Sequence, residues 1–283
     1  MIDMQPEATI TIPVDPYNPG QFFACCGLLE LTHRLTQPGY RALGWFEIID
    51  NAHPRFSITA FNRDAPITLE QTISYLKKCK ITATNQDSKE GPVILEEPFN
   101  IHLDWRSPFP QHNLVKTFTG QQNIFKIVRA LQQAMPESCD TELLNARGPV
   151  DRTVTAFSVE KAENSIDAGF SMDVQKGRLL REPPVFLEFL ALIGVQRFCP
   201  RQGKNRLDRI YYAWQNPLPS PLAAIAVSKP LKNVLQKGFI FQMYNRESKG
   251  RYKGFAPSRE LTQKKEKTHE STHRHQVGQF YSE

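Results

Sequence analysis

The chain has 283 residues, of which 40% are hydrophobic and 23% are charged, as in ordinary globular proteins. This length allows one large domain or two small ones. Because no apolar run is long enough to cross a bilayer and the N-terminus lacks the order of a secretory signal, we expect a cytoplasmic protein without a membrane partner. The five cysteines have no regular spacing, which predicts reduced thiols rather than a disulfide framework.

Basic residues are unevenly distributed along a chain whose net charge is +6. Residues 249–275 carry eight lysines and arginines against three acids. Two clusters are candidates for binding nucleic-acid phosphates. They are Arg197, Arg201, Lys204 and Arg206, and then Arg246, Lys249, Arg251 and Lys253. Tyr252, inside the second cluster, is a candidate for stacking on a base, as are Tyr211, Tyr212 and Trp214. The alternative is that the clusters are solvated charged loops.

The start of the chain predicts a strand followed by a buried helix. Residues 8–14 alternate between apolar and polar side chains, as in a short strand. The string Asn18-Pro19-Gly20-Gln21 is typical of a helix start, because asparagine caps well and proline suits the first helical position. The helix is apolar on nearly every side, so it should be buried, with Cys25 and Cys26 as core residues rather than reactive thiols.

The order of elements in the first half favours a ferredoxin-like fold. Residues 44–50 and 55–61 predict two strands of a hairpin, and residues 68–79 predict a helix capped by Thr68. With the first strand and helix, this gives strand, helix, strand, strand, helix. One more strand would complete a split βαβ unit, and residues 92–97 or 99–105 are candidates for it.

The second half predicts another layer of strands and helices. Helices are expected at 119–135 and 183–194, and strands at 153–159, in two runs within 209–228, and at 238–245. We therefore expect an α+β protein with one or two ferredoxin-like cores and a basic C-terminal tail. The expected division is an N-terminal region at 1–115, a second region at 116–256 and a disordered tail at 257–283.

The sequence offers little for catalysis. It contains no glycine-rich nucleotide loop, no Gly-x-Ser-x-Gly elbow and no His-Glu-x-x-His motif, and we expect no cofactor and no metal. His33 is a candidate for proton transfer, although a histidine at a helix end is more often structural. The histidines at 269, 273 and 275 lie close in sequence, which more often means adventitious metal affinity than a true site.

Four stretches carry a resemblance to a known family. They are VDPYNPGQFFACCGLLELTHRL at 14–35, GWFE at 44–47, FLEFLALIGVQRFCPRQ at 186–202 and YYAWQNPLPSPLAAIAV at 211–227. Together they resemble the Csb-type CRISPR-associated subunit of the subtype I-G interference system, formerly called I-U. The first stretch is the most specific of the four.

The resemblance implies a role in antiviral defence. It implies a non-catalytic subunit of a crRNA-guided type I (Cascade-like) complex, whose partners are other subunits and crRNA or target DNA. In such complexes base pairing reads the sequence while proteins hold the backbone. Two alternatives stay open: a metal-independent endoribonuclease that processes crRNA with His33, and a scaffold that contacts only other subunits.

Overall fold

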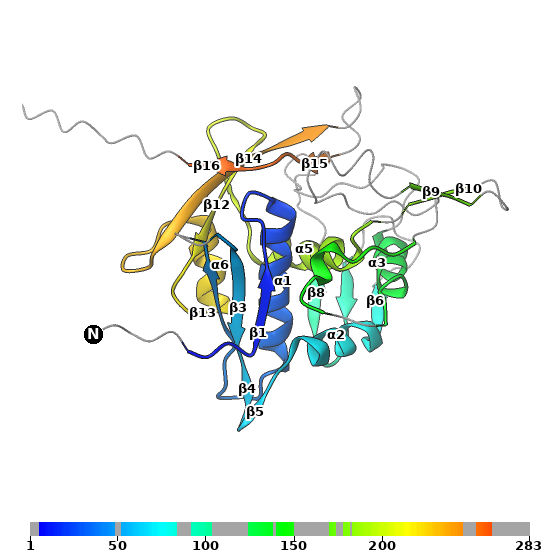
Figure 1. The fold of residues 1–283 in the computed structure, drawn as a ribbon, viewed down its shortest axis with the longest axis horizontal. Coiled ribbons are helices and arrows are strands. Elements are labelled where there is room, and N and C mark those ends of the chain that lie inside the picture. The colour runs from blue at the N-terminus through cyan, green and yellow to red at the C-terminus, as the bar shows by residue number, and fades with distance from the viewer. Residues whose placement is uncertain are drawn as a thin grey trace, which may run out of the picture.

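The structure is a computed structural model that describes residues 6–48, 52–83, 92–103, 124–137, 140–149, 170–173, 178–181, 183–245 and 253–261. These residues form a mixed α+β fold with five α-helices, and all of their strand pairs are antiparallel (Figure 1). The expected α+β class is therefore confirmed. The histidines at 269–275 and most of the expected basic tail lie outside the described residues.

The elements group into helices and small sheets. The helices are α1 (Pro19–Leu35), α2 (Leu69–Lys78), α3 (Ile124–Gln133), α5 (Val185–Arg197) and α6 (Ser220–Ser228), with a 3-10 turn at Leu143–Asn145. The first sheets are made of β1 (Ile10–Pro13), β2 (Leu43–Glu47), β3 (Arg55–Thr59), β4 (Phe61–Asn62), β5 (Ala65–Pro66), β6 (Ile81–Ala83), β7 (Val93–Leu95) and β8 (Ile101–Leu103). Later strands are β9 (Phe170–Asp173), β10 (Arg178–Arg181), β11 (Arg201–Gln202), β12 (Asp208–Trp214), β13 (Leu218–Pro219), β14 (Gln236–Asn245), β15 (Lys253–Phe255) and β16 (Arg259–Glu260).

Helix α1 begins where the sequence predicts. The Asn18 side chain accepts hydrogen bonds from the backbone N–H groups of Gly20 and Gln21, at 3.0 and 3.3 Å. Gln21 does not close a capping box, because its side chain accepts from the N–H of Asp15 instead, at 2.7 Å. Cys25 and Cys26 are fully buried, which confirms them as core residues, and burial raises the pKa of both thiols well above the ordinary value.

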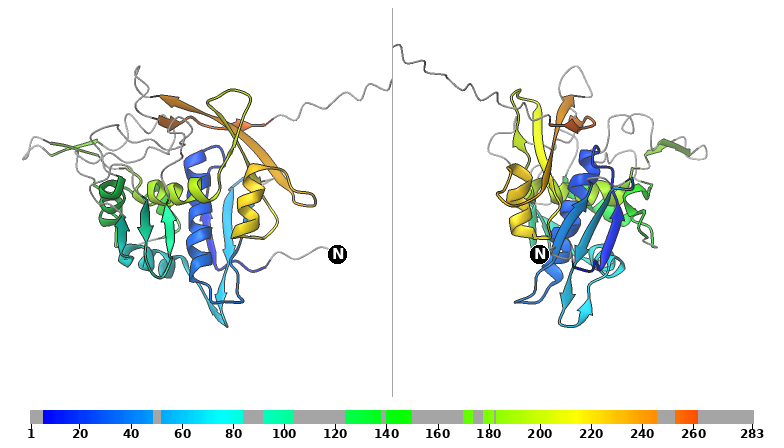
Figure 2. Two further views of the ribbon diagram at one scale, coloured as in Figure 1. Left: turned by 180° about the vertical axis from the view of Figure 1, so that it is seen from behind. Right: turned by 60° about the vertical axis from the view of Figure 1, so that its left-hand side comes forward.

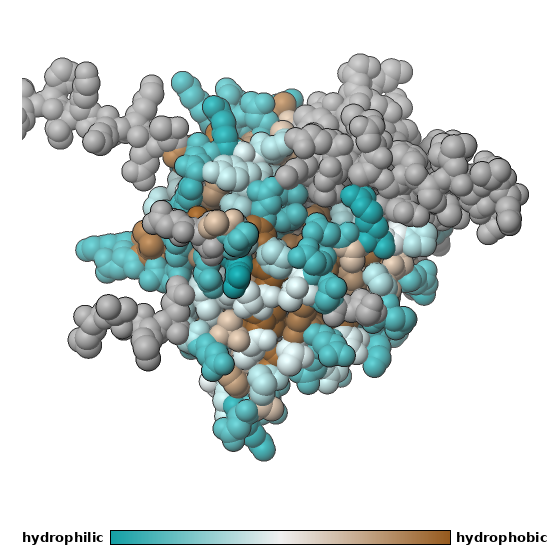
Figure 3. All heavy atoms as spheres, viewed as in Figure 1, coloured by the Kyte–Doolittle hydropathy of each residue, from teal (hydrophilic) through white to brown (hydrophobic). Residues whose placement is uncertain are grey.

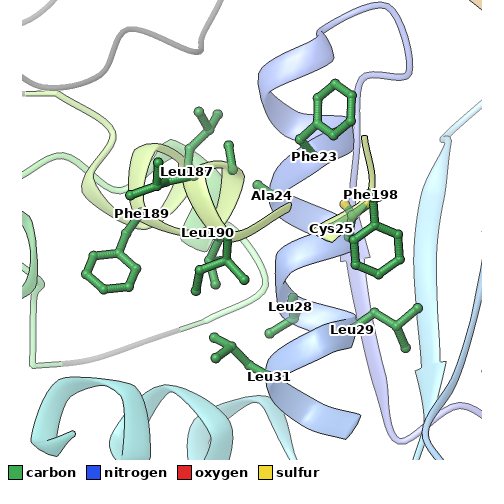
Figure 4. Close-up of a cluster of buried hydrophobic side chains, with 14 of the residues drawn as sticks. Phe23, Ala24, Cys25, Leu28, Leu29, Leu31, Leu187, Phe189, Leu190 and Phe198 are labelled. Atoms are coloured by element: carbon green, nitrogen blue, oxygen red, sulfur yellow. The ribbon is translucent and has the colours of Figure 1, made fainter. Parts of the chain in front are cut away.

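Helices α1 and α5 cross at two glycines. A Cβ atom on Gly27 would overlap the carbonyl oxygen of Leu190, and one on Gly194 would overlap the carbonyl oxygen of Phe23. The two backbones therefore touch at a separation that no side chain other than hydrogen permits. Apolar side chains of both helices surround this contact (Figure 4). The crossing lies at the centre of the molecule, with α1 upright and α5 across it in Figure 1.

The N-terminal sheet does not confirm the expected ferredoxin-like core. Its strand order is β1-β3-β2-β13, so β1, α1, β2 and β3 follow the split βαβ path. The expectation that residues 92–97 or 99–105 supply the missing strand is wrong, because they form β7 and β8 of a separate sheet with β6. The fourth strand is β13, which joins at the opposite edge, beside β2.

Helix α3 packs against the β6-β7-β8 sheet through an apolar face. Ile127, Leu131 and Met135 are buried, while Arg129 is exposed. Gln132 lies on the side of α3 that meets α2. Its side-chain amide donates to the carbonyl oxygens of Leu76 and Cys79, both at 2.8 Å, and so ties α3 to the end of α2. The expected strand at 153–159 and the start of the helix expected at 119–135 lie outside the described residues.

The second run within 209–228 is a helix, which corrects the strand predicted there. The first run is β12, but Ser220–Ser228 form α6. Strand β12 ends at Trp214, and Pro221 occupies the first turn of the helix, where its missing N–H costs nothing. Alanines favour a helix over a strand in this segment. Ala223, Ala226 and Val227 form its buried face.

One hydrophobic cluster joins the two expected regions. Phe22 of α1 stacks on Phe46 of β2 and tilts against Tyr211 of β12, with ring centroids 5.0 and 4.2 Å apart. Trp214 of β12 packs edge-on against Phe46 and donates its indole N–H to the carbonyl oxygen of Gly44 at 2.6 Å. In the left view of Figure 2, α1 stands between the β6-β7-β8 sheet on one side and α6 on the other. The division near residue 115 stays a prediction, and the described residues on either side of it share this core.

The glycine crossing gives the first testable prediction. Gly194→Ala should destabilise the protein by about 3 kcal/mol, because the added methyl group meets backbone that cannot move aside cheaply. The same change at a helix position without neighbours would stabilise by about 1 kcal/mol. Urea unfolding of the variant measures the effect, with Gln133→Ala on the exposed face of α3 as the control. A Gly194→Ala variant as stable as wild type would contradict the close crossing.

Candidate functional site

Three residues of the first basic cluster lie on the hairpin between β11 and β12. Arg201, Lys204 and Arg206 are exposed, and within the described part of the chain none of them forms an ion pair. Backbone hydrogen bonds close the hairpin, from Gly203 N–H to the carbonyl oxygen of Asp208 at 2.9 Å and from Asp208 N–H to that of Asn205 at 3.0 Å. The three cations therefore project from an ordered turn.

The single acid of this hairpin is buried and already bound. Asp208 is only 5% exposed, and its carboxylate accepts from the side-chain amides of Asn205 and Gln242, at 2.7 and 3.0 Å. Burial alone would raise the pKa of Asp208, but the hydrogen bonds from Gln242 and Asn205 outweigh it and hold the pKa below the ordinary value. The carboxylate is therefore hydrogen-bonded within the sheet, and among the described residues no ion pair joins it to the three exposed cations.

Arg209 stabilises the turn by hydrogen bonds to its backbone. The sequence analysis did not identify this role. Its guanidinium is buried and donates to the carbonyl oxygens of Arg206 and Asp208, at 2.8 and 2.9 Å. These bonds fix the backbone that carries Arg206. The signal in the sequence was weak, because a basic residue at the start of a strand is normally exposed.

Arg259 of β16 lies in the same sheet as the hairpin, beyond β12 and β14. In the pairing register Arg201 of β11 lies opposite Ile210 of β12, Ile210 opposite Ile240 of β14, and Ile240 opposite Arg259 of β16. Directly paired residues share a face, so Arg201 and Arg259 stand at the two ends of one row across four strands. Hydrophilic side chains gather at this end of the molecule, over β14 and β16 (Figure 3).

Arg197 does not join the other three cations. It ends α5, and its guanidinium Nε lies 3.3 Å from Oε1 of Glu30 on α1, while the hairpin continues away from it. Arg34 binds the same oxygen, at 2.9 Å from Nη2. The expected phosphate-binding cluster is thus divided into a hairpin with three cations and a separate group around Glu30.

Glu30 holds three helices together. Its side chain is about 95% buried, and Oε2 accepts a hydrogen bond from the hydroxyl of Ser220, at 2.5 Å, at the start of α6. Burial alone would raise the pKa of Glu30, but the Ser220 hydrogen bond and the charges of Arg197 and Arg34 together lower it. The carboxylate is therefore ionised at neutral pH and bridges α1, α5 and α6.

The second basic cluster falls mostly outside the described residues. This applies to Arg246, Lys249, Arg251 and Tyr252, while Lys253 begins β15 without a described side chain. The aromatic run of β12 is not available for base stacking, because Tyr211 and Trp214 are fully buried and Tyr212 is 8% exposed. All three rings face the core, since β12 lies between other strands and packs against α6.

The remaining candidates from the sequence show no assembled catalytic or metal site. His33 lies in the last turn of α1 near Glu30, and its pKa is lowered, mainly by burial, so the imidazole is neutral at pH 7. The four cysteines in the described ranges are free. Across those same ranges no three His, Cys, Asp or Glu side chains lie where they could share a metal ion.

No protein-family model, no curated protein and no solved structure matches this chain. Among the helices that the structure describes, none is both long and apolar enough to cross a membrane. The function must therefore be argued from the geometry above.

The Glu30 bridge predicts a pH-dependent stability. Because folding lowers the pKa of Glu30, the carboxylate stabilises the fold above its unfolded pKa, and this contribution is lost as the pH falls from about 5 towards 3. Glu30→Gln should cost about 2–3 kcal/mol at pH 7 and much less near pH 3. Urea unfolding at both pH values measures the difference.

Glu96→Gln is the matched control for this variant. Glu96 pairs with Lys80 on the surface at 3.1 Å, so its loss should cost less than about 1 kcal/mol at either pH. A Glu30→Gln variant with the same small, pH-independent loss would contradict the bridging role of Glu30.

Proposed function

We propose that this protein is a non-catalytic subunit of a crRNA-guided type I interference complex and that it binds nucleic-acid backbone through the β11–β12 hairpin. One observation supports the binding role above the others: Arg201, Lys204 and Arg206 are exposed without ion pairs among the described residues, while the nearby Asp208 is buried and satisfied. The resemblance to the Csb-type subunit supports the choice of system.

The hairpin has the physical properties that backbone binding needs. Phosphate contacts depend on cations whose charge is not already neutralised, because binding gains from the release of counterions on the nucleic acid. The bonds that Arg209 and Asp208 make within the turn fix the backbone before a ligand arrives, so less conformational entropy is lost on binding.

The sheet beside the hairpin extends the proposed contact. Arg259 stands three strands away from Arg201 on the same face, roughly 15 Å distant at the usual strand spacing. Such a span suits a strand of nucleic acid lying across the sheet rather than a single small anion. Because the cations would contact phosphates and not base edges, the proposed binding does not depend on the nucleotide sequence.

Charge reversal of the hairpin tests the proposal. The triple variant Arg201→Glu, Lys204→Glu and Arg206→Glu should weaken binding of the full chain to unrelated single-stranded oligonucleotides by similar factors. The slope of log affinity against log salt should fall by about 2, at roughly 0.7 for each phosphate contact. Fluorescence anisotropy across a salt series measures both quantities.

A control variant has the same change in net charge. Lys78→Glu, Lys229→Glu and Lys232→Glu alter exposed lysines on α2 and in the loop before β14, away from the hairpin. In this control variant the slope of log affinity against log salt should stay close to that of wild type. Equal losses in both variants would mean general electrostatic attraction, and unchanged binding in both would leave the scaffold role as the better account.

A further inference from the structure

The ends of three helices line a cavity beside Glu30 that is open to solvent. The cavity has a volume of about 490 Å³ and is lined by the last turn of α1, the loop at 36–40, the last residue of α5 and the first turn of α6. This volume lies within the usual range for small-ligand sites. Figure 2 shows α6 next to α1 in the view from behind.

The cavity has more positive than negative charge. Arg34 and Arg197 bind the same oxygen of Glu30, so two positive charges share one negative charge. Their nitrogens lie within about 6 Å of each other, since each contacts that oxygen, at 2.9 and 3.3 Å. The cavity therefore carries a net charge of about +1 from these three groups.

Both guanidiniums keep donors that Glu30 does not use. Arg34 gives Nε and Nη2 to Glu30, and Arg197 gives Nε. Each guanidinium has five N–H donors, so several remain on both arginines. The two side chains are 34% and 43% exposed, and both line the cavity. Arginine donors in such a pair suit the oxygens of a phosphate.

The start of α6 also favours an anion at this place. Helix α6 begins here without a side-chain cap, because residue 219 is a proline, so the N–H groups of its first turn contribute positive potential. Tyr40, which is 41% exposed, adds an aromatic surface at the rim.

We propose that this cavity is a binding site for a phosphate group, held by Arg34 and Arg197 over the start of α6. The site is separate from the β11–β12 hairpin. The phosphate could belong to a free anion or to a nucleic acid, with the adjoining sugar or base on Tyr40. Only the nucleic-acid source rests on the proposed function.

Inorganic phosphate tests the site directly on the full chain. Phosphate should raise the melting temperature of wild type in a saturable way, beyond a chloride control of equal ionic strength, because a ligand that binds only the folded state stabilises it. Arg197→Gln should raise the phosphate concentration needed for half of this effect at least tenfold, whereas Arg129→Gln, on the exposed face of α3, should not change it. Saturable stabilisation that is equal in wild type and both variants, or absent in wild type, would overturn the proposal.

If Arg197→Gln folds poorly, Arg197→Lys provides a second test of the same site. It retains the charge that Glu30 needs but loses the fork of donors, so it should fold and still bind phosphate more weakly. Broadening of the phosphorus NMR signal of phosphate gives a second readout that does not depend on unfolding. Wild-type binding by Arg197→Lys in both readouts would contradict a role for the guanidinium.

Oligonucleotides separate the two sources of the phosphate. A preference for a 5′-phosphorylated oligonucleotide over its 5′-hydroxyl form, lost in Arg197→Gln, would identify a terminal phosphate. Equal binding of both forms, weakened in Arg197→Gln, would identify the backbone. If neither oligonucleotide binds while inorganic phosphate still does, the proposed function fails and the phosphate site stands.

Discussion

The contact between Gly27 and Gly194 is the constraint on which the remaining architecture depends. At this point α1 and α5 touch backbone to backbone, and any side chain larger than hydrogen would separate them. Because the helices cannot slide apart there, the residues that follow each glycine reach fixed positions. Glu30 lies one turn after Gly27, and Arg197 lies one turn after Gly194. The ion pair between them is thus a consequence of where the helices cross.

The same crossing accounts for the separation of the two basic groups. Arg197 is still part of α5 and points its charge at α1, whereas Pro200 follows the helix and the chain then enters β11. Only three residues therefore separate Arg197, which is bound to a buried carboxylate, from Arg201, which faces solvent. Electrostatic roles follow secondary structure here more closely than they follow distance along the chain.

Local signals in the sequence predicted local structure well. The cap at Asn18, the apolar circumference of α1 and the burial of Cys25 and Cys26 all depend on neighbouring residues and were confirmed. The errors concern pairing between distant segments. Nothing near residues 92–105 says that they form their own sheet, and nothing near Leu218 says that it pairs with Gly44. The Glu30 site was missed for the same reason, since its members come from three helices far apart in the chain.

The pairing of β13 with β2 has a consequence for synthesis of the protein. The N-terminal sheet receives its last strand, and Gly44 its bond from Trp214, only from residues more than 150 positions later in the chain. At ribosomal rates this delay amounts to about 10–30 s, during which the edge of β2 has unpaired backbone groups. An open edge is a template for pairing with another chain. The nascent N-terminal half therefore passes through an interval of exposure to aggregation, during which binding by a chaperone would be of most benefit.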